Sequence, residues 1–150
     1  MASNDEILAR ARERATGMGL PYAGALTPAE AYELMRADPP AALVDVRSRA
    51  AWDFVGRVPG AVEIEWKSYP GMAPNPAFLQ QLTAKVPKEA TTMFLCRSGG
   101  RSHETATVAT RAGYTAAYNV LEGFEGDRDG AGHRNTVSGW RAAGLPWQQG

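Results

Sequence analysis

Apolar and polar residues follow two kinds of pattern along the chain, and together they predict a layered α/β domain. Short runs that are rich in apolar residues, or that alternate with period two, are typical of strands in a largely parallel sheet. Longer segments in which apolar residues recur every three or four positions are typical of helices. We expect strands at 41–46, 61–66, 91–96 and 115–121, and helices at 4–16, 28–38, 75–86 and 102–113. Strands that alternate with helices in this way indicate an α/β fold.

Local signals support the first two helices. Thr27 and Glu30 form a capping-box pattern around Pro28, and Pro39 marks the end of that helix. In the segment 4–16 the apolar face is weak, so we expect this helix to lie on the surface or to contact a partner.

A different pattern begins near the C-terminus. The segment 123–139 is rich in glycine and polar residues and predicts one long loop, which a short last helix within 139–147 would follow. Loops of this length inside a compact domain tend to be functional or mobile. The pattern alone assigns this loop no role.

Composition and charge narrow the class of protein. The chain has 150 residues, the usual size of one domain, and apolar residues make up 44% of it. Its 16 basic and 16 acidic residues give a net charge of +0, whereas nucleic-acid-binding proteins usually carry a basic excess, so we expect no nucleic-acid partner. The N-terminal residues lack the apolar stretch of a signal peptide, and no segment has the length of a membrane span. We therefore expect a cytoplasmic protein without a membrane partner.

The only cysteine of the chain stands in its most informative motif. Cys96 cannot form an internal disulfide. It follows a predicted buried strand, and a helix is expected to begin near Ser102, so the connection lies at the sheet edge where ligands of α/β proteins bind. Gly99 and Gly100 allow the backbone to curl with its N–H groups pointing inward. The start of the helix adds unpaired N–H groups and the positive end of its dipole.

These features predict an anion-binding loop around a thiol. Arg97 and Arg101 add positive charge, and each feature favours a thiolate over a thiol. A cysteine that only filled a gap in the core would not need this sequence around it. The candidate site therefore has Cys96 as nucleophile and the following substrate-binding residues: Arg97, Ser98, Gly99, Gly100, Arg101 and Ser102.

Asp45 and Arg47 are expected at the same edge of the sheet, because they end the predicted strand 41–46. The sequence leaves two roles open for this supporting pair. It shapes the wall of the site or contacts a donor anion, or it is a structural salt bridge that holds neighbouring loops.

The remaining candidates are weaker. His103 lies in the first turn of a helix, where we expect its side chain to point into solvent, and we expect the same of His133 on the long loop. Asp127 and Asp129 resemble the start of a calcium loop, but the further ligands and the spaced glycine do not follow. We therefore predict no metal site and assign neither histidine a role.

Three blocks of the sequence together resemble the rhodanese-type sulfurtransferases. The motif Cys-x-x-Gly-x-Arg-Ser at 96–102 resembles the active-site loop of that family. The segment 43–64, with "LVDVR" and "VPGA", resembles a second block of the family, and 121–147 resembles its closing segment. The likeness covers roughly residues 22–147.

The resemblance implies a three-layer α/β domain over residues 21–150, with a parallel five-stranded sheet flanked by helices on both faces, after a helical extension at 1–20. It also implies a sulfurtransferase that needs no cofactor, in which Cys96 alternates between thiolate and persulfide. The sulfur would come from a small anion such as thiosulfate and pass to a thiol, to cyanide or to a sulfur-accepting protein. Arg57 replaces a usual histidine and Ala51 a usual acidic residue, which leaves pocket charge and substrate choice open.

Two other functions compete with this one. Cysteine-dependent phosphatases and arsenate reductases, some of which share the fold, hold their anion with a cysteine and an arginine that are separated by five residues. Only four residues separate Cys96 from Arg101. One residue fewer shortens the loop by about 3.8 Å of chain, and the tighter ring suits one extra sulfur atom better than a phosphate. The third function is a sulfur carrier or regulatory binding module that holds sulfur for a dedicated partner without turnover.

Overall fold

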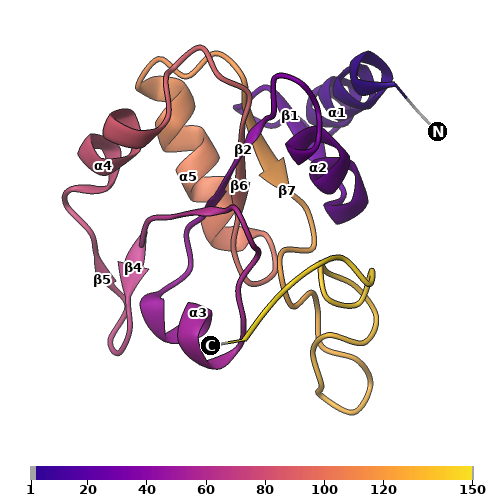
Figure 1. The fold of residues 1–150 in the computed structure, drawn as a ribbon, viewed down its shortest axis with the longest axis vertical. Coiled ribbons are helices and arrows are strands. Elements are labelled where there is room, and N and C mark those ends of the chain that lie inside the picture. The colour runs from indigo at the N-terminus through magenta and orange to yellow at the C-terminus, as the bar shows by residue number, and fades with distance from the viewer. Residues whose placement is uncertain (1–2, 150) are drawn as a thin grey trace.

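A parallel sheet of five strands forms the centre of the molecule, and helices cover both of its faces (Figure 1). The computed structural model describes residues 3–149. In spatial order the strands are β1 (Gly24–Leu26), β7 (Ala117–Val120), β6 (Thr92–Leu95), β2 (Ala42–Asp45) and β3 (Val62–Glu63). The helices are α1 (Asn4–Met18), α2 (Pro28–Met35), α3 (Arg49–Phe54), α4 (Phe78–Lys85) and α5 (Gly100–Arg111). A small antiparallel ribbon apart from the sheet consists of β4 (Lys67–Ser68) and β5 (Ala73–Pro74). Within 3–149, no helix is both long enough and apolar enough to cross a membrane.

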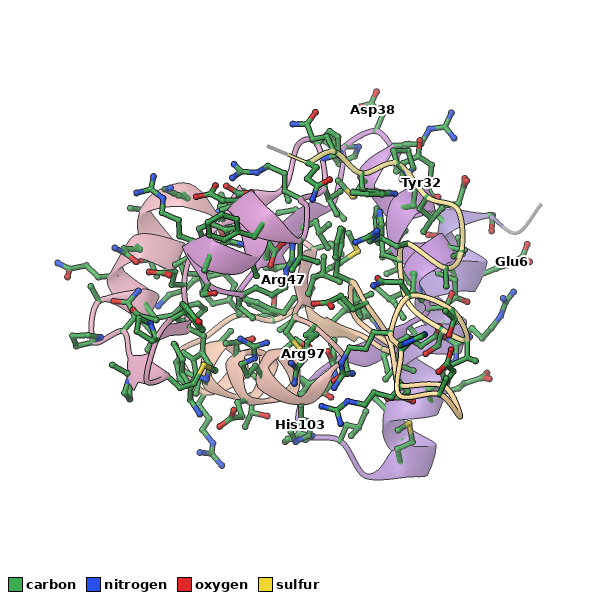
Figure 2. The ribbon with its side chains drawn as sticks, turned by 90° about the horizontal axis from the view of Figure 1, so that it is seen from below. Glu6, Tyr32, Asp38, Arg47, Arg97 and His103 are labelled. Carbon is green, nitrogen blue, oxygen red and sulfur yellow. The ribbon has the colours of Figure 1, made fainter. Side chains whose placement is uncertain are left out.

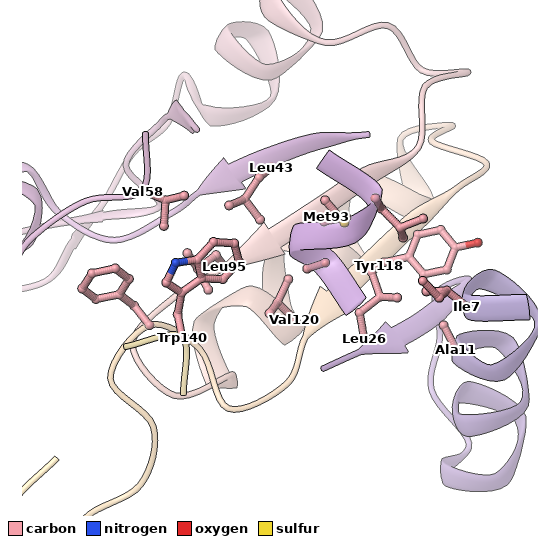
Figure 3. Packing of buried hydrophobic residues seen from close by; sticks show 13 residues of the cluster. Ile7, Ala11, Leu26, Leu43, Val58, Met93, Leu95, Tyr118, Val120 and Trp140 are labelled. Atoms are coloured by element: carbon pink, nitrogen blue, oxygen red, sulfur yellow. The ribbon is translucent and has the colours of Figure 1, made fainter. Parts of the chain in front are cut away.

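The two faces of the sheet carry separate cores, because successive side chains of a strand point to opposite sides. Met93 and Leu95 of β6 pack in the core with α1 and α2, whereas Phe94 and the adjoining Cys96 pack in the core with α4 and α5. Figure 3 shows the first core, in which Trp140 of the C-terminal segment lies near Leu95. The expected α/β fold, with a five-stranded parallel sheet between two helical layers, is confirmed.

The helix signals of the sequence act as expected at α1 and α2. The side chain of Ser3 accepts a hydrogen bond from the backbone N–H of Glu6 at the start of α1. At the start of α2, Thr27 and Glu30 each accept a hydrogen bond from the other's backbone N–H, which forms the predicted capping box. Helix α2 ends at Met35, somewhat earlier than predicted.

Helix α1 packs against the edge strand β1 and contributes to the first core. Its inner side is buried at Ile7, Ala11 and Ala15, while most of its other side chains are exposed. Arg14 lies 2.6 Å from a carboxylate oxygen of Glu30 and so ties α1 to α2. The surface position expected for this helix agrees with the structure, and the boundary between the extension and the domain stays a prediction.

Some elements differ from the expectation. Strand β1 has three residues and α3 has six, too few for periodicity to reveal them. Of the strand expected at 61–66, only Val62–Glu63 pairs with β2, at the edge of the sheet. The prediction of a short last helix within 139–147 is wrong. This segment forms turns, because Gly139 and Gly144 have φ angles of 102° and 75°, which a right-handed helix does not allow.

Candidate active site

The cysteine loop follows directly on β6, at the carboxyl edge of the sheet. Cys96 is the first residue after the strand, and α5 begins at Gly100, slightly before the expected position. Gly99 has a φ of 108°, which residues with a Cβ rarely adopt, and it turns the chain sharply into the helix. The turn places the backbone N–H of Gly99 so that it donates a hydrogen bond to Sγ of Cys96, at 3.1 Å.

The residues around the sulfur form a small pocket suited to an anion. The N–H groups of Gly100, Arg101 and Ser102 begin α5 and donate to no other residue that the structure describes. The positive end of the helix dipole lies at the same place. The pocket has a volume of about 400 Å³ and is lined by Cys96, Arg97, Ser98, Gly100, Arg101 and Glu104. The motif residues thus surround one pocket, and Gly99 and Ser102 contact the sulfur itself.

The thiol lies at the floor of this pocket rather than on the surface. Cys96 is only 1% exposed and packs in the second core. Two polar contacts distinguish it from an apolar filler, one from the N–H of Gly99 and one with Oγ of Ser102, 3.2 Å from Sγ. A sulfur in this position is reached by a ligand that enters the loop.

A chain of hydrogen bonds leads from the thiol to His103. Ser102 donates through Oγ to Oδ1 of Asn119 at 2.5 Å. Asn119 donates through Nδ2 to the carbonyl of Gly99 and to the hydroxyl of Tyr22, both at 3.2 Å. The hydroxyl oxygen of Tyr22 lies 2.9 Å from Nδ1 of His103. The group that contacts the sulfur is therefore held by partners from β7 and from the segment before β1.

Sequence reasoning missed Asn119 and Tyr22. Asn119 offered one signal, because it is a single amide in the otherwise largely apolar strand predicted at 115–121, and a buried amide needs partners. It is 3% exposed in the structure. Tyr22 offered none, since its contact with Asn119 joins positions far apart in the chain.

His103 is held by the protein, so the expectation that it points freely into solvent is wrong. Its side chain is half-buried and meets Tyr22 edge to face, with 5.3 Å between the ring centroids. Burial raises the pKa of Tyr22, although the hydrogen bond from Asn119 acts in the opposite direction, so the hydroxyl keeps its proton at neutral pH. Because this hydroxyl accepts from Asn119, its own hydrogen is available to Nδ1 of His103. His133 is exposed, as expected.

Asp45 and Arg47 form a fully buried ion pair on the face of the sheet opposite the thiol. Nη2 of Arg47 donates to Oδ2 of Asp45 at 2.7 Å and to the carbonyl of Gly56 at 2.8 Å. The guanidinium also stacks on Phe124, with its central carbon 4.2 Å from the ring centroid. The Asp45–Arg47 pair is therefore a structural salt bridge that also contacts neighbouring segments. A contact of this pair with a donor anion stays a prediction.

The start of the long C-terminal loop supports the cysteine loop. The backbone N–H of Phe124 donates to the carbonyl of Cys96 at 2.8 Å, and that of Glu125 donates to the carbonyl of Arg97 at 2.9 Å. Gly123 lies so close that a Cβ there would come within 2.5 Å of the Arg97 backbone. The segment to which the sequence assigned no role therefore holds the backbone of the candidate site.

Asp129 organises the outer part of the same loop. Its carboxylate accepts hydrogen bonds from the backbone N–H groups of Ala131 and His133 and from the hydroxyl of Thr136. The bond from His133, and then that from Thr136, lowers the pKa of Asp129. In the part of the chain that the structure describes, no three potential metal-ligating side chains of His, Cys, Asp or Glu cluster together.

The two positions that depart from the rhodanese pattern lie on the α3 side of the site. Nη1 of Arg57 pairs with Glu63 at 3.1 Å, and Nη2 pairs with Asp53. Ala51 lies in α3 and lines a groove next to the cysteine pocket. Neither position lines the pocket over Cys96.

Known proteins share this architecture and sequence. A protein from M. tuberculosis with a crystal structure is 48% identical, and the match covers 86% of this chain and 99% of that one with a TM-score of 0.78. An uncharacterised protein of Rickettsia conorii is 35% identical over 125 residues, which span 79% of this chain and 92% of the relative. The chloroplastic thiosulfate sulfurtransferase 16 of Arabidopsis thaliana is 28% identical over 93 residues, which span 61% of this chain and 67% of the relative.

A match to a family sequence model shows the family to which the chain belongs. A sequence model of the rhodanese-like domain matches residues 27–128, more than half of the chain. The matched region contains the sheet strands β2, β3, β6 and β7 and the whole cysteine loop. The chain therefore belongs to the rhodanese-like domain family.

Proposed function

We propose that this protein is a sulfurtransferase that carries sulfane sulfur as a persulfide on Cys96. The observation that carries the proposal is the position of Sγ at the floor of the loop pocket. The N–H of Gly99 donates to it there, and the unpaired N–H groups at the start of α5 lie beside it. The name of the Arabidopsis relative, a thiosulfate sulfurtransferase, supports the same chemistry.

Two half-reactions complete the cycle. The thiolate of Cys96 attacks the outer sulfur of a thiosulfate-like donor, so that a new S–S bond forms while the S–S bond of the donor breaks. Sulfite leaves with the electron pair of the broken bond, and a negatively charged terminal sulfur remains on the cysteine. The N–H groups at the start of α5, with Arg97 and Arg101, stabilise the negative charge of the donor and of this terminal sulfur. Cyanide or a thiolate then takes the outer sulfur and restores the cysteine thiolate, so the cycle needs no cofactor.

Phosphate hydrolysis is the less favoured use of the same loop. The ring from Cys96 to Arg101 is short, and it closes onto the sulfur through the N–H of Gly99. One additional sulfur atom on Sγ needs less space in such a ring than a phosphate needs.

Intact-mass measurement tests the proposal. After incubation with thiosulfate the reduced protein is expected to gain one sulfur atom, and cyanide is expected to remove it as thiocyanate. Cys96→Ser keeps a small polar side chain, and we expect it to fold and to gain no sulfur. A folded, reduced protein that takes sulfur from no sulfane donor would overturn the proposal, as would Cys96-dependent hydrolysis of an aryl phosphate without sulfur transfer. A persulfide that forms but turns over with no small acceptor would instead identify a sulfur carrier.

A further inference from the structure

A larger groove adjoins the cysteine pocket. It has a volume of about 730 Å³ and shares Arg97 and Arg101 with that pocket. Its outer wall is apolar, with Phe54 at the end of α3 and with Tyr69 and Met72 in the turn between β4 and β5. A ligand that occupied both cavities would have one end at the thiol and the other on this wall.

The apolar wall is unusually exposed. Phe54 is 78% exposed, Tyr69 is 68% exposed and Met72 is 43% exposed. Single exposed apolar side chains are ordinary, but three large ones in one cavity form a patch, and such patches mark binding sites. Ala51 also lines the groove, so the wall of α3 carries no charge at this position.

The base of the groove is positively charged. Arg97 and Arg101 form no ion pair with any residue within 3–149. Arg47 also lines the groove, but Asp45 neutralises it, and Glu125 contributes one negative charge. Figure 2 shows Arg47 and Arg97 near each other between α3 and α5. Two unpaired guanidinium groups against one carboxylate leave a net attraction for an anionic group.

The apolar lining of the groove favours an organic ligand over an inorganic one. A small ion such as thiosulfate fits inside the 400 Å³ pocket over the cysteine and leaves the groove empty. Both cavities fall in the range of about 300–1,000 Å³ that is typical of sites for organic molecules, so volume alone does not distinguish the two kinds of ligand. A ligand that consists only of sulfur and oxygen has no apolar group to pack against the apolar wall of the groove, whereas an organic ligand can have one.

We infer that the sulfur donor is an organic sulfane anion, with its charged sulfur end in the cysteine pocket and an apolar group of about the size of an aromatic ring on Phe54, Tyr69 and Met72. The inference rests on the proposed function and names the substrate class of that site. For a thiosulfonate donor, the Cys96 thiolate bonds to the terminal sulfur, and the S–S bond of the donor breaks. An organic sulfinate leaves with the electron pair of that bond, and the persulfide on Cys96 retains one negative charge.

Two thiosulfonates that differ only in their apolar group test this inference. Benzenethiosulfonate and methanethiosulfonate have the same charged end. For each compound, the rate of persulfide formation on Cys96 is divided by the rate at which the same compound reacts with a free small-molecule thiol. This ratio corrects for the intrinsic reactivity of the donor. We expect the corrected rate with the benzene compound to be higher by at least about tenfold, as for partial burial of one ring. Phe54→Ala is expected to remove most of this preference and, because the side chain is exposed, to leave the fold intact.

Met18→Ala is the matched control, since Met18 is an exposed apolar residue of α1 outside the groove. The preference is expected to be the same in this variant as in the unchanged protein. If both donors load sulfur but the preference is absent, or persists in Phe54→Ala, the inference is wrong while the proposed function stands. If neither thiosulfonate nor thiosulfate loads sulfur, the proposed function fails and the inference fails with it.

Discussion

Asn119 never touches the sulfur, yet it controls the group that does. Ser102 has one hydroxyl hydrogen and gives it to Oδ1 of Asn119, so the oxygen of Ser102 presents a lone pair to the thiol. The amide of Asn119 is fixed in turn by the carbonyl of Gly99 and the hydroxyl of Tyr22. The orientation of Ser102 is therefore set by a residue of β7.

Replacing Asn119 with alanine is expected to slow persulfide formation by about tenfold, which corresponds to about 1.4 kcal/mol. The reason is that the carbonyl of Gly99 loses its hydrogen bond from Nδ2 of Asn119, so the turn whose N–H donates to the sulfur is held less firmly. The free energy of unfolding is expected to fall by about 1–3 kcal/mol, because buried polar groups lose their partner. Intact-mass sampling over time with thiosulfate measures the rate, and urea denaturation measures the stability.

Tyr22→Phe is the matched variant, because it removes only the hydroxyl at the far end of the same chain. Asn119 then still accepts from Ser102 and still donates to Gly99, so we expect a smaller loss of rate than in Asn119→Ala. A larger loss in Tyr22→Phe would show that the hydrogen bond from Asn119 to the cysteine loop is not what governs the reaction.

At the scale of elements, the candidate site depends on three segments that meet at one edge of the sheet. Strand β6 ends at the thiol, α5 supplies its N-terminal N–H groups, and the segment after β7 holds the loop carbonyls. Gly123 is where this last segment comes closest, with a φ of 66° and no room for a Cβ beside Arg97.

Gly123→Ala is expected to push the cysteine loop out of position. The free energy of unfolding should fall by at least about 1 kcal/mol, because alanine disfavours positive φ and the added carbon meets backbone atoms. Persulfide formation should slow as well, since the displaced carbonyls belong to the loop that holds the sulfur. Urea denaturation and sulfur loading from thiosulfate measure the two effects.

Gly130→Ala provides the comparison for this variant. Gly130 lies in the same loop, and a Cβ there would meet nothing within 4 Å. We expect its stability to stay within about 0.5 kcal/mol of the unchanged protein and its sulfur loading to be normal. Equal effects of the two substitutions would show that loop flexibility, rather than contact with the cysteine loop, is responsible.

At the scale of the whole molecule, Glu30 of α2 forms ion pairs with Arg10 and Arg14 and so adds to the packing that holds α1 on the fold. Burial raises the pKa of Glu30, but hydrogen bonds from Arg14 and Thr27 outweigh it, so the pKa is lowered in the folded protein. A carboxylate with a lowered pKa stabilises the fold above its unfolded pKa. That contribution is lost as the pH falls through the folded pKa.

Glu30→Gln keeps the capping-box geometry and removes only the charge. We expect the free energy of unfolding at pH 7 to fall by about 1–2 kcal/mol, since charge-assisted hydrogen bonds are lost. The difference from the unchanged protein should narrow at pH 3, because the contribution of Glu30 is lost as the pH falls from the unfolded pKa through the lowered folded pKa. Urea denaturation at the two pH values measures this. Glu33→Gln, in an exposed pair with Arg36 at 3.9 Å, should change stability little at either pH.

Local patterns in the sequence determined much of the fold and the centre of the site. The apolar runs of β2, β6 and β7, the capping box of α2 and the motif from Cys96 to Ser102 all act through neighbours close in the chain. The direction of a strand, the start of a helix and the turn of a loop depend on such neighbours, so one sequence is enough to recognise them.

Only the tertiary structure decided which distant residues serve the site. Strand pairing brought Asn119 of β7 beside the loop after β6, and the alternation of side chains placed the Asp45–Arg47 pair on the opposite face from the thiol. The apolar groove exists because residues of α3 and of the turn between β4 and β5 line one cavity together with the two loop arginines. These contacts join segments far apart in the chain, and their energy depends on packing in three dimensions, which the order of residues in one sequence does not display.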